Sequence, residues 1–207
     1  EMPVYLPFVK TGKTPKVIQL GPEGKHLFIS NWHDRSVTVV DISSPVPEKW
    51  KVLKTIETGS VPRGLAVSKT YGKLYVAHMG GGDISVIDCQ DLSVVQHVRR
   101  GRTPRHLLVD ERFLYASLSS PEKLIKVNLT DLVTQAEVST YDDPRTIAFS
   151  GDHSLVFVTC YSAERLQVFG TEKLKALGSW PSKGKPVGVA IHQEGNTMEA
   201  WVCNRSE

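Results

Sequence analysis

The sequence predicts an all-β chain of repeated antiparallel strands, and three observations support this fold class. Proline recurs at Pro15, Pro62, Pro104, Pro144 and Pro186, and each opens a similar segment: PKVIQL, PRGLAV, PRHLLV, PRTIAF and PVGVAI. The third and fifth residues after each proline are apolar, which is the two-residue period of a β-strand. No amphipathic stretch of helical period and useful length interrupts the 207 residues.

The composition is that of an ordinary globular chain, with 40% hydrophobic and 23% charged residues and a net charge of +3. Apolar runs all fall short of the roughly 18 residues that a membrane-spanning helix needs. The first residues, EMPV, lack the basic and then apolar layout of a signal peptide. Cys89, Cys160 and Cys203 have no CxxC spacing and cannot all pair, so neither a zinc site nor a disulfide framework is predicted.

Each repeat contains four predicted strands in a fixed order. The segment after the proline is the first, and a polar turn leads to the second: HLFIS, KLYVA, FLYAS, LVFVT and EAWVC. The third strands are VTVVDI, ISVIDC, LIKVNL and LQVFGT, and the fourth are KVLKTIETG, SVVQHVRRG, VTQAEVST and KLKALGSW. Many of these strands are apolar on both faces, so both faces of each sheet must be covered.

Four-stranded antiparallel units of this length, stacked face to face around an axis, are the blades of a β-propeller. We therefore predict a single β-propeller domain over residues 1–207, with repeats at about 15–61, 62–103, 104–143, 144–185 and 186–207. Four blades are complete and the fifth is partial. Residues 4–12 read as a fourth strand without its blade, so we expect the chain to be part of a larger propeller. An oligomer could form through the open blade edge.

Several segments match a known repeat pattern: LFISN, LYVAH, SVTVVD, ISVID, KTIETGSVPRGLAVS and VVQHVRRGRTPRHLLVD. In these residues the units resemble the YVTN family of β-propeller repeats. The resemblance implies a seven-bladed propeller, with five blades as the alternative. It also implies a bacterial or archaeal source, with export to the periplasm or the cell surface. At the end of the second strand, where the family has asparagine, this chain has Asn31 and Asn204 but departs from the family at His78, Leu118 and Cys160.

The antiparallel order decides which loops share a surface. The link from a fourth strand to the next first strand lies at the same end of the blade as the turn between strands two and three. The links 10–16, 57–63, 99–106, 139–145 and 183–186 carry eleven basic and three acidic side chains, a net charge of +8. We predict that they form a basic rim. The residue after the proline is basic in four repeats: Lys16, Arg63, Arg105 and Arg145.

These four basic residues should lie near the mouth of the central channel and attract an anion or an acidic surface. The alternative is a structural role, in which they pair with Asp34, Asp83, Glu122 or Glu164 or cap loop carbonyls. The turns between second and third strands add aromatic and adaptable side chains suited to a protein interface. The candidate binding residues are therefore Lys16, Arg63, Arg105, Arg145, Asn31, Trp32, His33, His78 and His106.

No metal site, catalytic residue or cofactor is predicted. His33, His78 and His106 come from successive repeats, and no carboxylate or cysteine recurs beside them as a further ligand, which is a weak basis for a metal or haem site. The GKT at 12–14 lacks the glycine and the helix of a phosphate loop, and the DHS at 152–154 is most simply a turn. Three functions remain, in this order: a binding scaffold for a protein or other acidic partner, a propeller-type enzyme (a lactonase-like hydrolase or a haem or quinone oxidoreductase domain), and a nucleic-acid binder.

Overall fold

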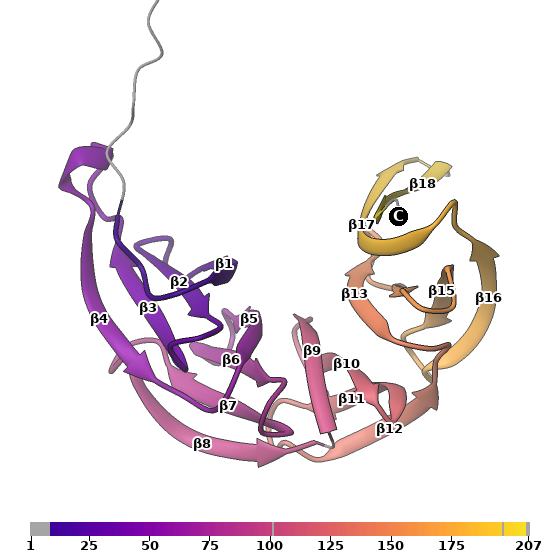
Figure 1. Ribbon diagram of the computed structural model, residues 1–207, viewed down its shortest axis with the longest axis horizontal. Coiled ribbons are helices and arrows are strands. Elements are labelled where there is room, and N and C mark those ends of the chain that lie inside the picture. Colours follow the sequence, from indigo (N-terminus) through magenta and orange to yellow (C-terminus); the bar gives the residue numbers. More distant parts are fainter. Residues whose placement is uncertain (1–8, 101, 196, 206–207) are drawn as a thin grey trace, which may run out of the picture. The chain divides into compact units, whose positions relative to one another are not determined.

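The computed structural model describes residues 9–100, 102–195 and 197–205, which form five antiparallel sheets (Figure 1). Sheet A contains β1 (Pro15–Leu20), β2 (His26–Asn31), β3 (Ser36–Asp41) and β4 (Lys51–Glu57). Sheet B contains β5 (Pro62–Ser68), β6 (Lys73–His78), β7 (Asp83–Asp88) and β8 (Ser93–Arg99). Sheet C contains β9 (Arg102–Val109), β10 (Phe113–Ser120), β11 (Glu122–Asn128) and β12 (Thr134–Ser139). Sheet D contains β13 (Pro144–Phe149), β14 (Leu155–Cys160), β15 (Arg165–Gly170) and β16 (Lys175–Pro181), and sheet E contains β17 (Lys185–Glu194) and β18 (Thr197–Arg205).

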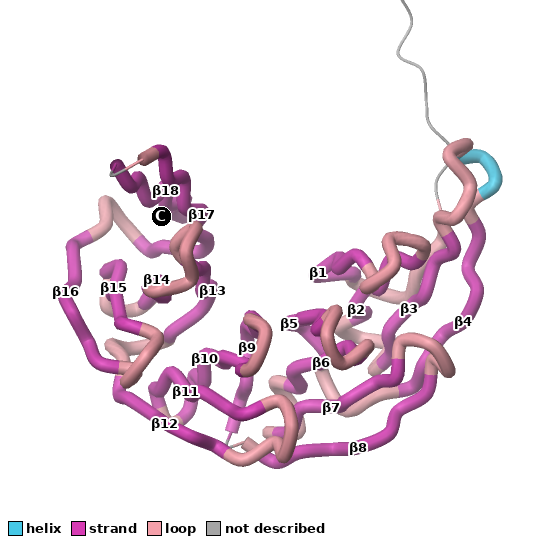
Figure 2. Tube along the Cα trace, turned by 180° about the vertical axis from the view of Figure 1, so that it is seen from behind, coloured by secondary structure: helices cyan, strands magenta, loops and turns pink. Residues whose placement is uncertain are grey.

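The predicted all-β class and the four-stranded units are confirmed. In sheets A to D each strand pairs with the next one along the chain, in the order first, second, third, fourth. Within the described residues the single helical element is a 3₁₀ turn at Pro47–Lys49, in the proline-rich loop between β3 and β4 (cyan in Figure 2). Residues 1–8, with much of the additional strand expected at 4–12, lie outside the described residues.

The middle strands of the four-stranded sheets A to D are covered on both faces, as their apolar sequences predict. In β6 the consecutive residues from Leu74 to His78 are all buried, although neighbouring residues of a strand point to opposite faces. The outer strand β4 shows the opposite pattern, with Ile56 as its one buried residue. Burial on both faces requires each sheet to pack against a neighbour.

The chain divides into two compact units, Glu1–Arg99 and Arg100–Glu207. In the first unit, Phe28, Val37 and Val39 of sheet A share one apolar core with Leu74 and Val76 of sheet B. This core stabilises the pair because apolar surface leaves water, at about 25 cal/mol per Å².

In the second unit, Tyr115 and Leu124 of sheet C pack against Val156, Val158 and Phe169 of sheet D. The other face of sheet D contacts the β17–β18 hairpin, which contributes apolar residues such as Val189 and Val202. Sheets C, D and E therefore stack in sequence order within this unit.

Hydroxyl groups on the second strands join neighbouring sheets. Ser30 Oγ accepts a hydrogen bond from Val17 N at 3.2 Å and donates to the carbonyl of Arg63 at 2.8 Å. In the second unit, Ser117 Oγ accepts from His106 N at 3.2 Å and donates to the carbonyl of Arg145 at 2.7 Å. Each serine thus fixes the backbone of the basic residue that follows the proline of the next sheet.

Candidate functional site

One local geometry recurs at the link end of sheets A, B and D. The residue before the proline has a positive φ, at Thr14, Val61 and Asp143. Its carbonyl accepts a hydrogen bond from the first residue of the turn after the second strand: Trp32 N to Thr14 O at 3.1 Å, Met79 N to Val61 O at 3.1 Å and Tyr161 N to Asp143 O at 3.0 Å. In these sheets the links and the turns between second and third strands therefore meet, as the antiparallel order predicts.

In the first unit this geometry places two of the candidate cations against one indole ring. Lys16 Nζ lies 5.4 Å and the Arg63 guanidinium carbon 5.6 Å from the centroid of the Trp32 ring. Lys16 comes from β1, Trp32 from the turn after β2, and Arg63 from β5 of the next sheet. We call Lys16, Trp32 and Arg63 the Trp32 cluster. Both distances lie within the range of cation–π attraction.

The Trp32 cluster faces solvent in part. Trp32 and Arg63 are half-buried and Lys16 is exposed. Asp34, one of the acidic residues that a structural role would use, instead accepts a hydrogen bond from Lys13 N. Beside the cluster, the exposed His33 hydrogen-bonds through Nδ1 to Thr14 Oγ1 at 2.7 Å. Among the described residues, Lys16 forms no ion pair with a carboxylate within 4.0 Å.

In the second unit one of the two equivalent arginines, Arg145, is held by its own sheet. Arg145 stacks on Tyr161, with its guanidinium carbon 3.2 Å from the ring centroid. It also donates from Nε and Nη2 to Asp143 Oδ2, at 3.0 and 2.9 Å. Arg145 thus has the kind of local partner that a structural role requires, although Asp143 is not one of the acids named from the sequence.

Arg105 and His106 lie on β9 and are half-buried. His106 Nδ1 accepts a long hydrogen bond from Ile147 N at 3.4 Å, and its own amide donates to Ser117 Oγ. His106 therefore bridges β9 and β13.

Asn31 and His78, two candidates at the ends of second strands, have no exposed surface. Asn31 Nδ2 donates to Ser36 Oγ at 3.0 Å and to Thr38 Oγ1 at 2.8 Å. A glycine of the link covers each side chain: a Cβ on Gly12 would lie 2.7 Å from Asn31 Cγ, and one on Gly59 would lie 2.8 Å from His78 Cγ. Their direct contacts are with the protein interior, beneath the links.

His78 belongs to a hydrogen-bonded group that the sequence did not reveal. Its Nε2 lies 2.7 Å from Ser85 Oγ, which lies 3.1 Å from His97 Nδ1, and that nitrogen lies 2.9 Å from Asp83 Oδ2. Burial lowers the pKa of His78 to about 4; Asp83 acts in the opposite direction and His97 lowers the pKa further. The available signal was Ser85, a polar residue at a buried position of β7.

This group contains a serine, histidines and an aspartate, but its geometry differs from a hydrolytic triad. In a triad, opposite ring nitrogens of one histidine contact the serine and the aspartate, whereas here His97 Nδ1 contacts both. Ser85 also has no exposed surface, so a substrate cannot reach its hydroxyl. The group is therefore structural rather than nucleophilic.

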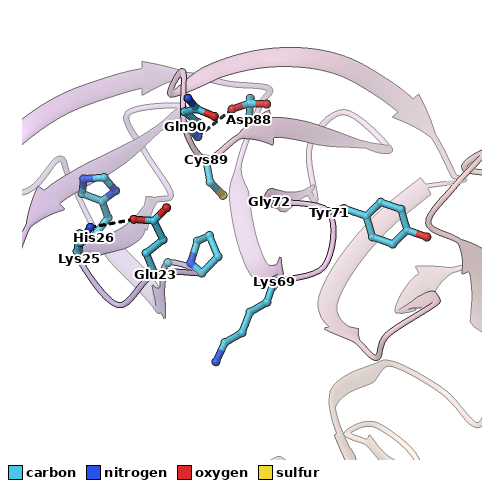
Figure 3. Close-up of a pocket in the computed structure, with 11 residues that line it drawn as sticks. Glu23, Lys25, His26, Lys69, Tyr71, Gly72, Asp88, Cys89 and Gln90 are labelled. Carbon is cyan, nitrogen blue, oxygen red and sulfur yellow. Dashed lines mark hydrogen bonds and ion pairs between the residues drawn. The ribbon is translucent and has the colours of Figure 1, made fainter.

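A pocket of about 460 Å³ lies at the opposite end of sheets A and B, where the turns between first and second strands meet (Figure 3). Its charges are largely compensated, because Lys25 pairs with Glu23 and Asp88 pairs with Lys73. Burial raises the pKa of the Cys89 thiol to about 11, so almost none of it is thiolate at neutral pH. Among the described residues, no three His, Cys, Asp or Glu side chains converge as a metal ion requires.

Among the described residues, no helix is long and apolar enough to cross a membrane. No family model matches the chain. A curated relative is Antigen Lp49 of Leptospira interrogans serogroup Icterohaemorrhagiae serovar copenhageni (strain Fiocruz L1-130). It is 27% identical over 159 residues, which cover 72% of this chain and 34% of the relative.

Two solved structures show the fold. Hydrazine synthase of Kuenenia stuttgartiensis matches with a TM-score of 0.74 and 20% identity, over 88% of this chain and 54% of that one. The Cps50 (Swd1) β-propeller domain of Myceliophteria thermophila matches with a TM-score of 0.72 and 14% identity, over 93% of this chain and 64% of that one.

The chain therefore has the β-propeller fold, with blades of four antiparallel strands. It spans about a third of the length of the curated relative and between half and two thirds of the two solved structures. The narrower YVTN family and the number of blades stay predictions. At these identities the likeness to solved structures extends to the fold and to no activity.

Proposed function

We propose that this chain is a non-enzymatic binding module, which recruits an acidic protein partner through the Trp32 cluster. The observation that carries the proposal is that cations from two consecutive sheets lie against one half-buried indole. Trp and Arg are enriched where protein interfaces concentrate their binding energy.

Charge supports an acidic partner. The links carry a net charge of +8 in a chain whose total is +3, and Lys16 has no carboxylate partner among the described residues. A carboxylate of the partner would pair with Lys16 beside Arg63, while an apolar neighbour would cover the exposed part of Trp32. Electrostatic complementarity of this kind sets orientation and association rate.

The scaffold supports precise placement of these groups. Ser30 fixes the backbone carbonyl of Arg63, and Trp32 N is bonded to the carbonyl of Thr14. Because the backbone under the cluster is held before binding, little ordering entropy is lost when a partner arrives.

Binding of an Asp- and Glu-rich peptide at pH 7 tests the proposal. Lys16→Ala with Arg63→Ala should weaken binding by about 1–2 kcal/mol, or roughly 5- to 30-fold in Kd. The matched control is Lys49→Ala with Lys69→Ala, which removes the same charge from exposed positions outside the cluster.

Two outcomes would overturn the proposal. Equal weakening by both double variants would mean that net charge alone attracts the peptide. Tighter binding of a single-stranded DNA of equal charge, with a steep loss of affinity as salt rises, would favour the nucleic-acid function instead.

The proposal extends to location at the bacterial cell surface or in the periplasm. It is supported by the relative named as an antigen in Leptospira, at 27% identity. Fractionation of the source cells, with an antibody to the chain, tests this part; recovery in the cytoplasm would contradict it.

A further inference from the structure

The hydrogen-bonded group around His78 runs from solvent to the interior of sheet B. Asp83 and Ser85 lie on β7, His97 on β8 and His78 at the end of β6. His97 is exposed, whereas Ser85 and His78 are fully buried. Sheet A has no such group: at the position of His78 it has Asn31, which cannot titrate.

The donors and acceptors fix where the protons lie. The Asp83 carboxylate only accepts, so His97 Nδ1 carries a hydrogen, which Ser85 Oγ also faces. Ser85 then donates its own hydrogen to His78 Nε2. The amide of Gly59 points at the same nitrogen from 3.4 Å. We therefore assign His78 Nε2 as an acceptor, which places the hydrogen of the neutral ring on Nδ1.

His78 lies under the link that leads to Arg63. Gly59 packs directly on the ring, with room for no Cβ. The turn beyond His78 holds the same link, because Met79 N donates to Val61 O at 3.1 Å and Gly80 N donates to Ser60 O at 3.1 Å. Val61 has a φ of 59° and precedes Pro62 and Arg63, so these bonds hold a β-branched residue in an unfavourable conformation.

A proton on His78 Nε2 would reverse this arrangement. The nitrogen would become a donor facing both the hydroxyl hydrogen of Ser85 and the amide of Gly59. Of the titratable groups that act on His78, Asp83 would attract the new charge and a protonated His97 would repel it. Ser85 can turn to accept, but the Gly59 amide cannot, so the strain falls on the link.

We propose that His78 is a proton-sensitive positioning residue, which holds the link before Arg63 while it is neutral and releases that link when it is protonated. Acid would then dissociate the partner by misplacing Arg63 in the Trp32 cluster. This last step rests on the proposed function; the release of the link does not. Burial lowers the pKa of His78 to about 4, so the transition is centred near pH 4.

Backbone amide exchange measured from pH 7 to pH 3 tests the release of the link. The reporters are Met79 N and Gly80 N, which donate to the link of sheet B, and the internal controls are Trp32 N and His33 N, which donate to the link of sheet A. After correction for the intrinsic rates, the reporters should lose about tenfold or more of their protection and the controls should not.

His78→Asn, which copies Asn31 of sheet A, should abolish this pH-dependent loss. Should that variant fail to fold, Ser85→Ala is the second test: it removes a donor to neutral His78 and should move the transition to higher pH. Equal pH dependence of reporters and controls, or an unchanged transition in the variants, would overturn the inference.

A second experiment, which measures anion binding, separates this inference from the proposed function. Polyvinylsulfonate keeps its charge over this pH range, so its affinity reports on the protein alone. Wild-type affinity should fall about fivefold or more on acidification, and His78→Asn should hold its affinity. If the exchange step is present but Lys16→Ala with Arg63→Ala leaves binding unchanged, the proposed function fails and the release of the link stands.

Discussion

Replacing Lys126 should show how sheets C and D are held together. Lys126 lies on β11 and is 7% exposed, although the equivalent residues of the other three complete sheets are the valines 39, 86 and 168. Its Nζ donates to the carbonyls of Thr171 and Glu172, at 2.7 and 3.3 Å. The ammonium also lies 4.0 Å from the centroid of the Phe113 ring. At a position where the other sheets have valine, the Lys126 ammonium is thus surrounded by two carbonyl oxygens and the Phe113 ring.

Lys126→Met keeps most of the side-chain volume and removes the charge. The partly buried carbonyl of Thr171 loses its donor, which costs about 1–3 kcal/mol, and loss of the cation–π contact adds about 1 kcal/mol. Relief of the ammonium's desolvation, which lowers the pKa of Lys126, offsets part of this. We expect a net loss of about 2 kcal/mol.

Urea unfolding followed by tryptophan fluorescence measures this effect. With a slope of about 2 kcal/mol per M, the midpoint should fall by about 1 M. Lys126→Val introduces the residue of the other sheets but leaves a void, so its urea midpoint should fall further. A urea midpoint for Lys126→Met equal to or above that of the wild type would refute the reasoning. The free-energy cost of desolvating the ammonium would then exceed the stabilisation from its hydrogen bonds and its contact with the Phe113 ring.

Three further predictions concern stability and thiol chemistry. The pKa of His78 is about 4 in the folded protein and 6.5 ordinarily, so the unfolded chain binds the proton more readily. The free energy of unfolding should therefore be highest above about pH 6.5 and fall by up to ~3 kcal/mol towards pH 4. In urea titrations, His78→Asn should remove this loss. Gly59→Ala should lower the thermal midpoint by several degrees, because its Cβ would meet the His78 ring at 2.8 Å; an unchanged midpoint would contradict this packing. In the native protein a thiol reagent should label the exposed Cys203 rapidly and spare the buried Cys89 and Cys160. Burial raises the thiol pKa values of these two residues to about 11 and 12. Labelling of all three thiols would contradict this prediction.

Much of the fold was predictable because strand patterns are local. The alternation after each proline predicts the first strands, and consecutive apolar residues such as those of KLYVA predict strands covered on both faces. The antiparallel order also predicts that links and turns share an end, which the bond from Trp32 N to Thr14 O shows for sheet A. None of these steps requires knowledge of which residues touch across sheets.

The candidate site was less predictable because it depends on such contacts. Asn31 and Trp32 are neighbours in the sequence, yet Asn31 is buried under Gly12 and Trp32 meets the cations of two sheets. Likewise no spacing rule joins His78 to Ser85 and His97, which come together through strand register.

By itself the sequence determined the strands, their order and the end of each sheet where the basic residues lie, since a two-residue period and a recurring proline are properties of short segments. The tertiary structure alone decided which of those residues are accessible and which are held inside, as with exposed Lys16 and buried His78. The physical reason is that burial and hydrogen bonding of a side chain depend on the link and the sheet packed against it, which the residue's own strand does not specify.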